Sequence, residues 1–118
     1  MNGRLFGTSG IRGVANLEIS PSLAYKVGLS LAKNLKEGPV VIGYDTRTSS
    51  QMLSSALASG VCSGGLNATV LGMTPTPTLA YLSKALHAKA GAMITASHNP
   101  PDHNGLKLFT GEGMTYNR

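Results

Sequence analysis

Apolar residues recur every three or four positions in three stretches of this chain, which is the spacing of one face of an α-helix. The first helix is predicted to follow an N-cap at Ser20, with Pro21 in its first turn, and to end at Gly38-Pro39. The second is predicted to start from a cap at Ser49 or Ser50 and to close at Gly64-Gly65, and the third to run from Thr76-Pro77 through Leu86. The chain therefore alternates helices with the segments that separate them.

The segments between the helices are predicted to be strands, at residues 40–44, 68–71 and 90–95, and a further short strand is expected near Leu5-Phe6 or at 11–14. The continuous apolar run 40–44 is typical of a strand covered on both faces, and the apolar run 90–94 is likewise expected to be a buried strand. After the last run, Asn104-Gly105 predicts a hairpin turn into an antiparallel strand at 106–109. Alternation of strands and helices favours an α/β fold in which helices cover both faces of a mixed, mostly parallel sheet with a C-terminal antiparallel hairpin.

In such a sheet, the loops at the carboxyl ends of the parallel strands share one edge, where ligands bind. The segments 44–49, 72–76 and 96–104 each follow a predicted strand. We therefore expect Arg47, the Thr-Pro-Thr-Pro segment and Ser97 to lie on one rim of the sheet.

Composition narrows the functional classes. The chain has 118 residues, 42% hydrophobic and 13% charged, which fits one globular domain. No stretch approaches the ~20 apolar residues of a membrane span, and the N-terminus has no signal-peptide apolar region, so a cytoplasmic location is expected. Cys62 cannot form an intrachain disulfide because it is the only cysteine. It falls in an apolar helical pattern, which predicts a small buried hydrophobic residue.

The net charge of +5 comes from scattered Lys and Arg residues, while aromatic residues are only 5% of the chain. This distribution disfavours nucleic acid as a partner, because base stacking needs aromatic platforms and backbone binding needs a basic stripe. A small anionic substrate fits better, since Arg12, Arg47 and Lys107 lie beside Gly- or Pro-rich loops.

Ser97 is the strongest candidate for chemistry, because it follows a core strand on a tight polar loop. The adjacent His98 would point away from it in extended backbone, and no GxSxG motif surrounds the serine, which disfavours a Ser-His-Asp hydrolase. Phosphoryl transfer suits the position better, since it depends on positioning and charge neutralisation more than on a strong base.

Lys107 has two interpretations. It is either a solvated lysine on an edge strand, or it is folded back beside the Ser97 loop by the Asn104-Gly105 turn. In the second arrangement it would neutralise a phosphoryl oxygen or move a proton to the attacking hydroxyl.

Two loops could bind phosphate. Residues 7–13 combine glycines with the hydroxyls of Thr8 and Ser9 and the guanidinium of Arg12, which suit an anion, although a plain Gly-rich turn is the alternative. Residues 45–49 likewise offer Arg47 or form only a helix start with an Asp–Arg pair. His87 and His103 show no ligand spacing, so a metal cage from this chain alone is not expected.

Taken together, three segments resemble the first domain of the α-D-phosphohexomutases, the family of phosphoglucomutase, phosphomannomutase and phosphoglucosamine mutase. They are Phe6-Gly7-Thr8-Ser9-Gly10-Ile11-Arg12-Gly13, Gly43-Tyr44-Asp45-Thr46-Arg47, and Thr95-Ala96-Ser97-His98-Asn99-Pro100 followed by Asn104-Gly105-Leu106-Lys107. The resemblance spans essentially the whole chain and implies a three-layer α/β/α sandwich with a mixed sheet.

The resemblance also implies a reversible shift of a phosphoryl group between the 1- and 6-positions of a hexose phosphate. Phosphorylated Ser97 would donate its group, giving a hexose 1,6-bisphosphate that reorients and returns the other one. One Mg²⁺ would bridge the seryl phosphate and an aspartate-rich loop, so Ser97 would be a metal ligand through its phosphoryl group. Lys107 and His98 would transfer protons and neutralise phosphate, and Arg12 would lie near the reacting group. Phosphate-binding contacts are expected from Thr8, Ser9, Gly10, Arg12, Arg47 and Asn99.

Members of this family have four domains, and residues 1–118 correspond to the first. The metal loop and the loops that read the sugar do not occur in this sequence, so the hexose is not determined and the isolated chain is expected to be inactive without domains II–IV. The alternative is a non-catalytic phosphosugar-binding or regulatory module. The presence of Ser97, Lys107 and Arg12 favours the enzyme.

Overall fold

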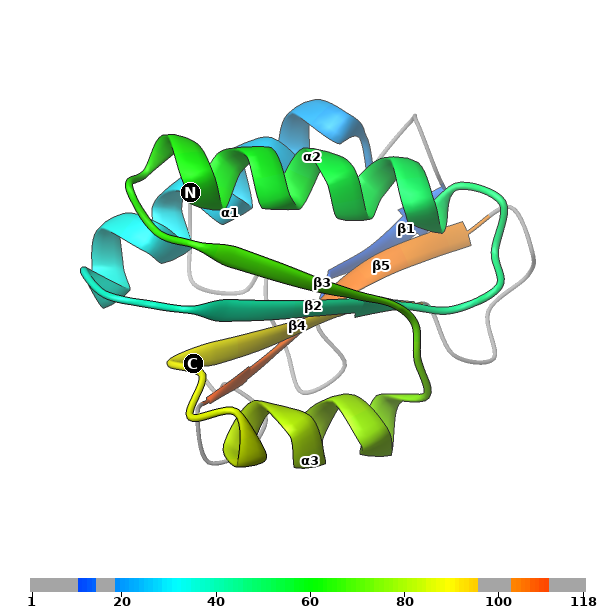
Figure 1. Ribbon diagram of the computed structural model, residues 1–118. Helices are drawn as coiled ribbons and strands as arrows, with labels where there is room; N and C mark the ends of the chain where they lie inside the picture. Colours follow the sequence, from blue (N-terminus) through cyan, green and yellow to red (C-terminus); the bar gives the residue numbers. More distant parts are fainter. Residues whose placement is uncertain (1–10, 15–18, 96–102, 111–118) are drawn as a thin grey trace.

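The computed structural model describes residues 11–14, 19–95 and 103–110, and for 11–14, 103 and 110 it describes the backbone alone. These residues form three layers, with α1 and α2 on one face of a five-stranded sheet and α3 on the other (Figure 1). The elements in chain order are β1 (Ile11–Val14), α1 (Pro21–Leu35), β2 (Val40–Tyr44), α2 (Ser50–Ser63), β3 (Ala68–Met73), α3 (Thr76–Ala85), β4 (Ala90–Ile94) and β5 (His103–Thr110). The predicted α/β/α sandwich is confirmed.

Local sequence signals set the helix ends. Ser20 Oγ accepts a hydrogen bond from the backbone N–H of Leu23 (3.1 Å), and Pro21 follows in the first turn, as predicted. The helix α1 ends earlier than predicted, at Leu35, because Lys36 adopts a left-handed conformation (φ 67°) and its N–H bonds to Ala32 O at 2.9 Å.

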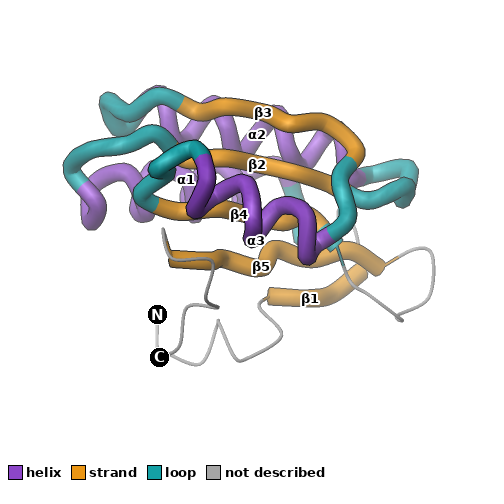
Figure 2. The backbone as a smooth tube through the Cα atoms, turned by 60° about the horizontal axis from the view of Figure 1, so that its bottom comes forward, coloured by secondary structure: helices purple, strands orange, loops and turns teal. Residues whose placement is uncertain are grey.

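The strand order is β1-β5-β4-β2-β3 (Figure 2). Strand β2 lies between β3 and β4 and is parallel to both, whereas β5 is antiparallel to its neighbours β4 and β1. Among the described strands β5 alone therefore runs against the common direction, and the prediction of a mixed, mostly parallel sheet is confirmed.

The prediction of a turn at Asn104-Gly105 is wrong, because both residues lie inside β5. They pair with Gly13 and Arg12 of β1. The Asn104 side chain is fully buried and donates hydrogen bonds to Ser49 and Ser50 at the start of α2. These tertiary hydrogen bonds keep the Asn-Gly dipeptide in a strand, although its local preference is for a turn. The antiparallel strand itself is confirmed, and its connection from β4 lies outside the described residues. Since β5 has a neighbour on each side, Lys107 is not on an edge strand.

Alternate residues of β2 pack into two apolar clusters, one on each face of the sheet. Val40 and Ile42 pack with Leu53 and Leu57 under α1 and α2. Val41 faces α3 and packs with a cluster that comprises Leu79, Ala88, Met93 and Phe109. Two-sided burial explains why this strand reads as a continuous apolar run.

Cys62 is exposed, so the prediction that it is buried is wrong. Leu57 and Val61 lie in the buried stripe of α2, at the spacing i, i+4. Cys62 follows directly, and one further residue turns the side chain by about 100° around the helix axis, towards solvent. Among the described helices, none has both the length and the apolar character to cross a membrane.

Candidate active site

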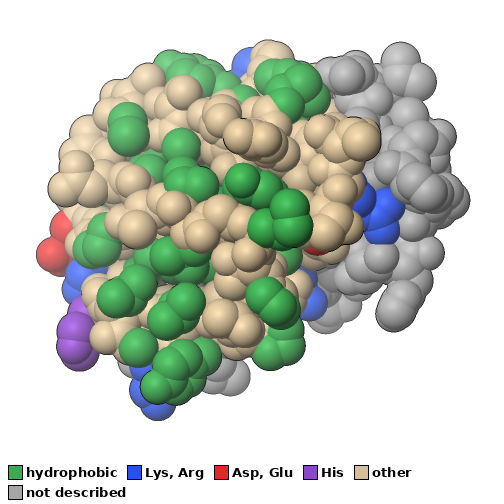
Figure 3. Space-filling model, turned by 45° about the vertical axis from the view of Figure 1, so that its right-hand side comes forward, with side chains coloured by type: hydrophobic (Ala, Val, Ile, Leu, Met, Phe, Trp, Pro, Cys, Tyr) green, Lys and Arg blue, Asp and Glu red, His purple; other side chains and the backbone are tan. Residues whose placement is uncertain are grey.

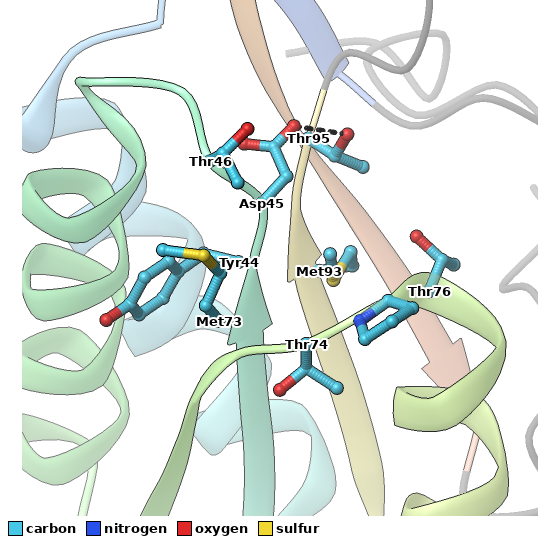
Figure 4. Close-up of a pocket in the computed structure, with 9 residues that line it drawn as sticks. Tyr44, Asp45, Thr46, Met73, Thr74, Thr76, Met93 and Thr95 are labelled. Carbon is cyan, nitrogen blue, oxygen red and sulfur yellow. Dashed lines mark hydrogen bonds between the residues drawn. The ribbon is translucent and has the colours of Figure 1, made fainter.

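The carboxyl ends of β2, β3 and β4 meet at one edge of the sheet, as predicted. The backbone N–H of Asp45 bonds to Ile94 O (3.1 Å), and that of Thr74 bonds to Tyr44 O (2.9 Å). A pocket of about 320 Å³ lies at this edge, between the strand ends and the start of α3 (Figure 4). It is lined by Tyr44, Asp45, Thr46, Met73, Thr74, Pro75, Thr76, Met93 and Thr95.

The side of the molecule shown in Figure 3 carries many hydrophobic side chains, separated by backbone and by side chains of other types. The exposed large hydrophobic residues of the described part include Val70 and Met73 on β3 and Tyr81 on α3. Met73 is 66% exposed and also lines the pocket, so one wall of the pocket is apolar and open to solvent.

Asp45, directly after β2, is the centre of the polar contacts at this edge. Its Oδ1 accepts hydrogen bonds from Ser50 Oγ (2.6 Å) and from the backbone N–H of Arg47 (3.0 Å). Its Oδ2 accepts from Thr95 Oγ1 (2.7 Å), the dashed line in Figure 4, and from Arg47 Nε (3.2 Å). Each carboxylate oxygen thus accepts two hydrogen bonds from described residues.

Asn104 extends these contacts to β5. Its Nδ2 donates to Ser49 Oγ (2.8 Å) and to Ser50 Oγ (2.9 Å), and its Oδ1 accepts from the N–H of Gly105 (2.9 Å). We call Asp45, Arg47, Ser49, Ser50, Thr95 and Asn104 the Asp45 cluster. It joins the ends of β2 and β4, the start of α2 and the first residues of β5.

The hydrogen bonds hold Asp45 in its ionised form. Partial burial raises the pKa of the Asp45 carboxyl, but the bonds from Ser50, Thr95 and Arg47 and the positive charge of Arg47 together bring that pKa below its ordinary value of 3.8. Asp45 is therefore a carboxylate at neutral pH.

Arg47 shows one of its two predicted roles. Its side chain is 11% exposed and forms an ion pair with Asp45 (3.2 Å), the pair expected at a helix start. Binding of phosphate by Arg47 stays a prediction.

Lys107 lies on the same side of the sheet as the pocket. It pairs with Met93 of β4, which lines the pocket, and side chains of directly paired residues share a face. Its ammonium lies 5.7 Å from the centre of the Phe109 ring, a cation–π contact that stabilises this half-buried lysine.

Other predicted site residues lie outside the described part of the chain. These are Thr8, Ser9, Gly10, Ser97, His98 and Asn99, while Arg12 is described by its backbone, which pairs with Gly105 in β5. Their roles stay predictions. Thr95 is the last described residue before the segment containing Ser97, and Asn104 is the first residue after it whose side chain is described.

The described residues do not by themselves fit a metal site. They contain no group of three or more His, Cys, Asp or Glu side chains that could hold an ion. Within the described part of the chain, Asp45 supplies the carboxylate at this edge, and its oxygens already accept the hydrogen bonds given above.

Sequence reasoning missed the role of Asn104 and Ser50. Asn104 precedes a glycine, which is a strong turn signal, and Ser50 is by its sequence position a candidate helix cap. Ser49 Oγ makes no cap bond to α2 and instead accepts from Asn104. The sequence does contain a signal for this polar cluster, because Asp45, Ser49 and Ser50 follow one another closely after a buried strand.

Comparison with known proteins decides the family. Residues 3–118 match the family described as phosphoglucomutase/phosphomannomutase, alpha/beta/alpha domain I. The chain belongs to this family. It is 52% identical over 114 residues to a probable phosphoglucosamine mutase of Pyrococcus horikoshii, covering 97% of this chain and 25% of that protein. It is also 52% identical over 116 residues to the phosphoglucosamine mutase of Carboxydothermus hydrogenoformans, covering 95% of this chain and 26% of that protein.

Solved structures agree with the family. A phosphomannomutase-like protein of Thermus thermophilus superposes with a TM-score of 0.87 at 35% identity, over 94% of this chain and 26% of that one. A phosphoglucomutase/phosphomannomutase family protein of Burkholderia thailandensis gives a TM-score of 0.80 at 26% identity, over 98% of this chain and 28% of that one. The chain thus spans about a quarter of the length of the relatives it matches.

Proposed function

We propose that this chain is the phosphoserine-bearing first domain of a phosphosugar mutase that moves a phosphoryl group between the 1- and 6-positions of a hexose phosphate. The observation that supports the proposal most is the family match over residues 3–118, which includes Ser97, three positions along the sequence from the last residue of β4. In α/β folds, the residues that react with a ligand often lie in loops at the carboxyl ends of the parallel strands, because the strands give these loops a rigid support.

In this proposal Ser97 carries the phosphoryl group. The Ser97 oxygen attacks one phosphorus of the bisphosphosugar as the bond from that phosphorus to the sugar oxygen breaks, and the reverse step regenerates the bisphosphosugar. Lys107 and His98 neutralise phosphoryl oxygens and move the proton that the serine hydroxyl loses or regains. Arg12 offers a two-pronged contact to the same group, and Thr8, Ser9, Gly10, Arg47 and Asn99 contribute further donors.

Glucosamine phosphate is the substrate that we favour. The curated relatives at 52% identity are named phosphoglucosamine mutases. The residues that read the sugar are expected in the further domains II–IV, which would act as the partners of this domain. A bound Mg²⁺ would supply a Lewis acid at the seryl phosphate in the complete enzyme, and the described residues are assigned no part in holding it.

The proposal is tested in a fusion enzyme, in which residues 1–118 replace the corresponding quarter of the Carboxydothermus hydrogenoformans phosphoglucosamine mutase. Incubated with glucosamine 1,6-bisphosphate, the fusion enzyme should gain one phosphoryl group on the peptide that contains Ser97, as read by mass spectrometry. It should convert glucosamine 6-phosphate to glucosamine 1-phosphate in a coupled assay.

The Ser97→Ala variant should lose the added phosphoryl group and lose more than about 10³-fold in kcat, because a covalent carrier has no substitute. Ser22→Ala is the matched control, since Ser22 is an exposed serine of α1. A phosphoryl group on another residue, or a Ser97→Ala variant within tenfold of the parent rate, would reject the proposal.

A further inference from the structure

We propose that the Asp45 cluster is a positioning device for phosphoryl transfer: it fixes Thr95, the last described residue before the segment containing Ser97, and Asn104, the first residue after it whose side chain is described, to one point at the start of α2. The inference rests on the proposed function, because it is Ser97 that makes this segment chemically important. It concerns residues that hold the flanks of the segment and that need not touch the substrate.

The two flanks meet through Asp45 and Ser50. On the incoming side, Thr95 Oγ1 donates to Asp45 Oδ2 at 2.7 Å. On the outgoing side, Asn104 Nδ2 donates to Ser50 Oγ at 2.9 Å, and that hydroxyl donates in turn to Asp45 Oδ1 at 2.6 Å. The path from one flank to the other is thus an unbroken series of side-chain hydrogen bonds.

Backbone bonds and burial make the arrangement rigid. The N–H of Thr95 bonds to Gly105 O at 3.0 Å, and the N–H of Asp45 bonds to Ile94 O at 3.1 Å. Ser50 and Asn104 are 0% exposed and Thr95 is 8% exposed. Hydrogen bonds to a carboxylate are shorter and stronger than neutral ones, and shielding from water strengthens them further.

Asp45 is suited to positioning rather than to proton transfer. A carboxylate has about four acceptor positions. Among the described residues, Ser50, Thr95 and Arg47 provide four donors to its two oxygens. With its pKa below the ordinary value and its oxygens engaged in this way, Asp45 is a poor general base and a good anchor.

The consequence for the reaction is geometric. Phosphoryl transfer depends on an in-line approach of the nucleophile, and a misplacement of ~1 Å can cost on the order of 10²-fold in rate. Loosening the flanks should therefore slow the transfer step while leaving substrate affinity nearly unchanged, since the proposed function expects the residues that read the sugar in further domains.

A matched pair of serine variants tests the proposal in the fusion enzyme. Ser50 and Ser83 are both 0% exposed, and each hydroxyl donates one hydrogen bond, to Asp45 and to Leu79 O (2.9 Å) respectively. Ser83 lies in α3, outside the Asp45 cluster. Ser50→Ala should lower kcat and the single-turnover rate of phosphoryl transfer by roughly 10- to 100-fold with KM within about threefold, whereas Ser83→Ala should leave both unchanged.

Two substitutions of Thr95 give a second, independent test, in which the conservative variant should restore the rate. Thr95→Val keeps the side-chain shape but removes the donor to Asp45, and should lower kcat as Ser50→Ala does. Thr95→Ser restores a hydroxyl and should recover most of the rate. Thermal unfolding, measured alongside, confirms that every variant is folded at the assay temperature.

The outcomes separate the two proposals. If the parent fusion enzyme takes up phosphate on Ser97 and Ser50→Ala is as fast as Ser83→Ala, the positioning role is wrong while the proposed function stands. A rise in KM with unchanged kcat, or a Thr95→Ser variant as slow as Thr95→Val, would also overturn it. If the parent carries no phosphoryl group on Ser97, both proposals fall.

Discussion

Replacement of Gly60 by alanine should force α1 and α2 apart. A Cβ at Gly60 would lie 2.1 Å from the carbonyl oxygen of Tyr25 and 2.9 Å from the N atom of Leu29. Both are backbone atoms of α1, so no side-chain rotation relieves the clash. The contact is reciprocal, since a Cβ at Gly28 of α1 would lie 2.3 Å from Leu57 O in α2. The two helices touch backbone to backbone, and glycine is required by the approach rather than by its φ angle.

The expected cost follows from two opposing effects. Overpacking of a closed contact costs about 1–3 kcal/mol, and the upper end applies where backbone must move by about 1 Å. Alanine regains up to about 1 kcal/mol of helix propensity over glycine. The net loss in the free energy of unfolding is therefore about 2 kcal/mol, which lowers the melting temperature of a domain of this size by about 8 °C.

Urea and thermal unfolding followed by far-UV circular dichroism measure this loss in the 118-residue chain. Ser59→Ala is the control, because Ser59 is the exposed neighbour of Gly60 in α2, where alanine changes helix propensity alone. That variant should lie within about 0.5 kcal/mol of the parent. A Gly60→Ala chain as stable as Ser59→Ala would refute the close helix contact.

Two further predictions concern Asp45 and the isolated chain. Because the folded-state pKa of Asp45 is lower than its ordinary 3.8, its charged form stabilises the fold above that pH, and the contribution is lost as the pH falls towards the folded-state value. Asp45→Asn should therefore be less stable than the parent by about 2 kcal/mol near neutral pH, and the gap should narrow in urea titrations at acidic pH; a gap independent of pH would contradict the assignment. The isolated 118-residue chain should show no mutase turnover in the coupled assay, because it spans about a quarter of the length of its relatives and we expect the residues that read the sugar in further domains; clear Mg²⁺-dependent turnover would contradict this.

Most elements could be predicted because their signals are local. Ser20 caps the first turn of α1 with its hydroxyl, and Pro21 has a fixed φ angle that suits the first helical position. The continuous apolar run 40–44 forms a strand that is covered on both faces. The sheet edge that carries the pocket also followed from the sequence, since strand direction brings Asp45, Thr74 and Thr95 to one edge. These features need no knowledge of distant residues.

The errors arise where distant residues decide the outcome. Asn104-Gly105 favours a turn by local chemistry, but two serines at the start of α2 hold the Asn104 amide in β5. The partners of Asp45 could not be predicted for the same reason, because Thr95 lies 50 positions away in the sequence. The error at Cys62 has a local cause: it comes one position after the buried residue Val61, and the spacing of apolar residues does not define the edge of a buried helix face to a single residue.

The helix α2 links the stability of the fold to the geometry of the site. Gly60 seats α2 against the backbone of α1, and Ser50, at the first turn of the same helix, holds both Asp45 and Asn104. A helix of 14 residues moves largely as a rigid rod, so a displacement at Gly60 is carried to Ser50. If the Asp45 cluster positions the segment that contains Ser97, as proposed above, the close packing of α1 and α2 on the face of the sheet opposite α3 would therefore influence that segment as well.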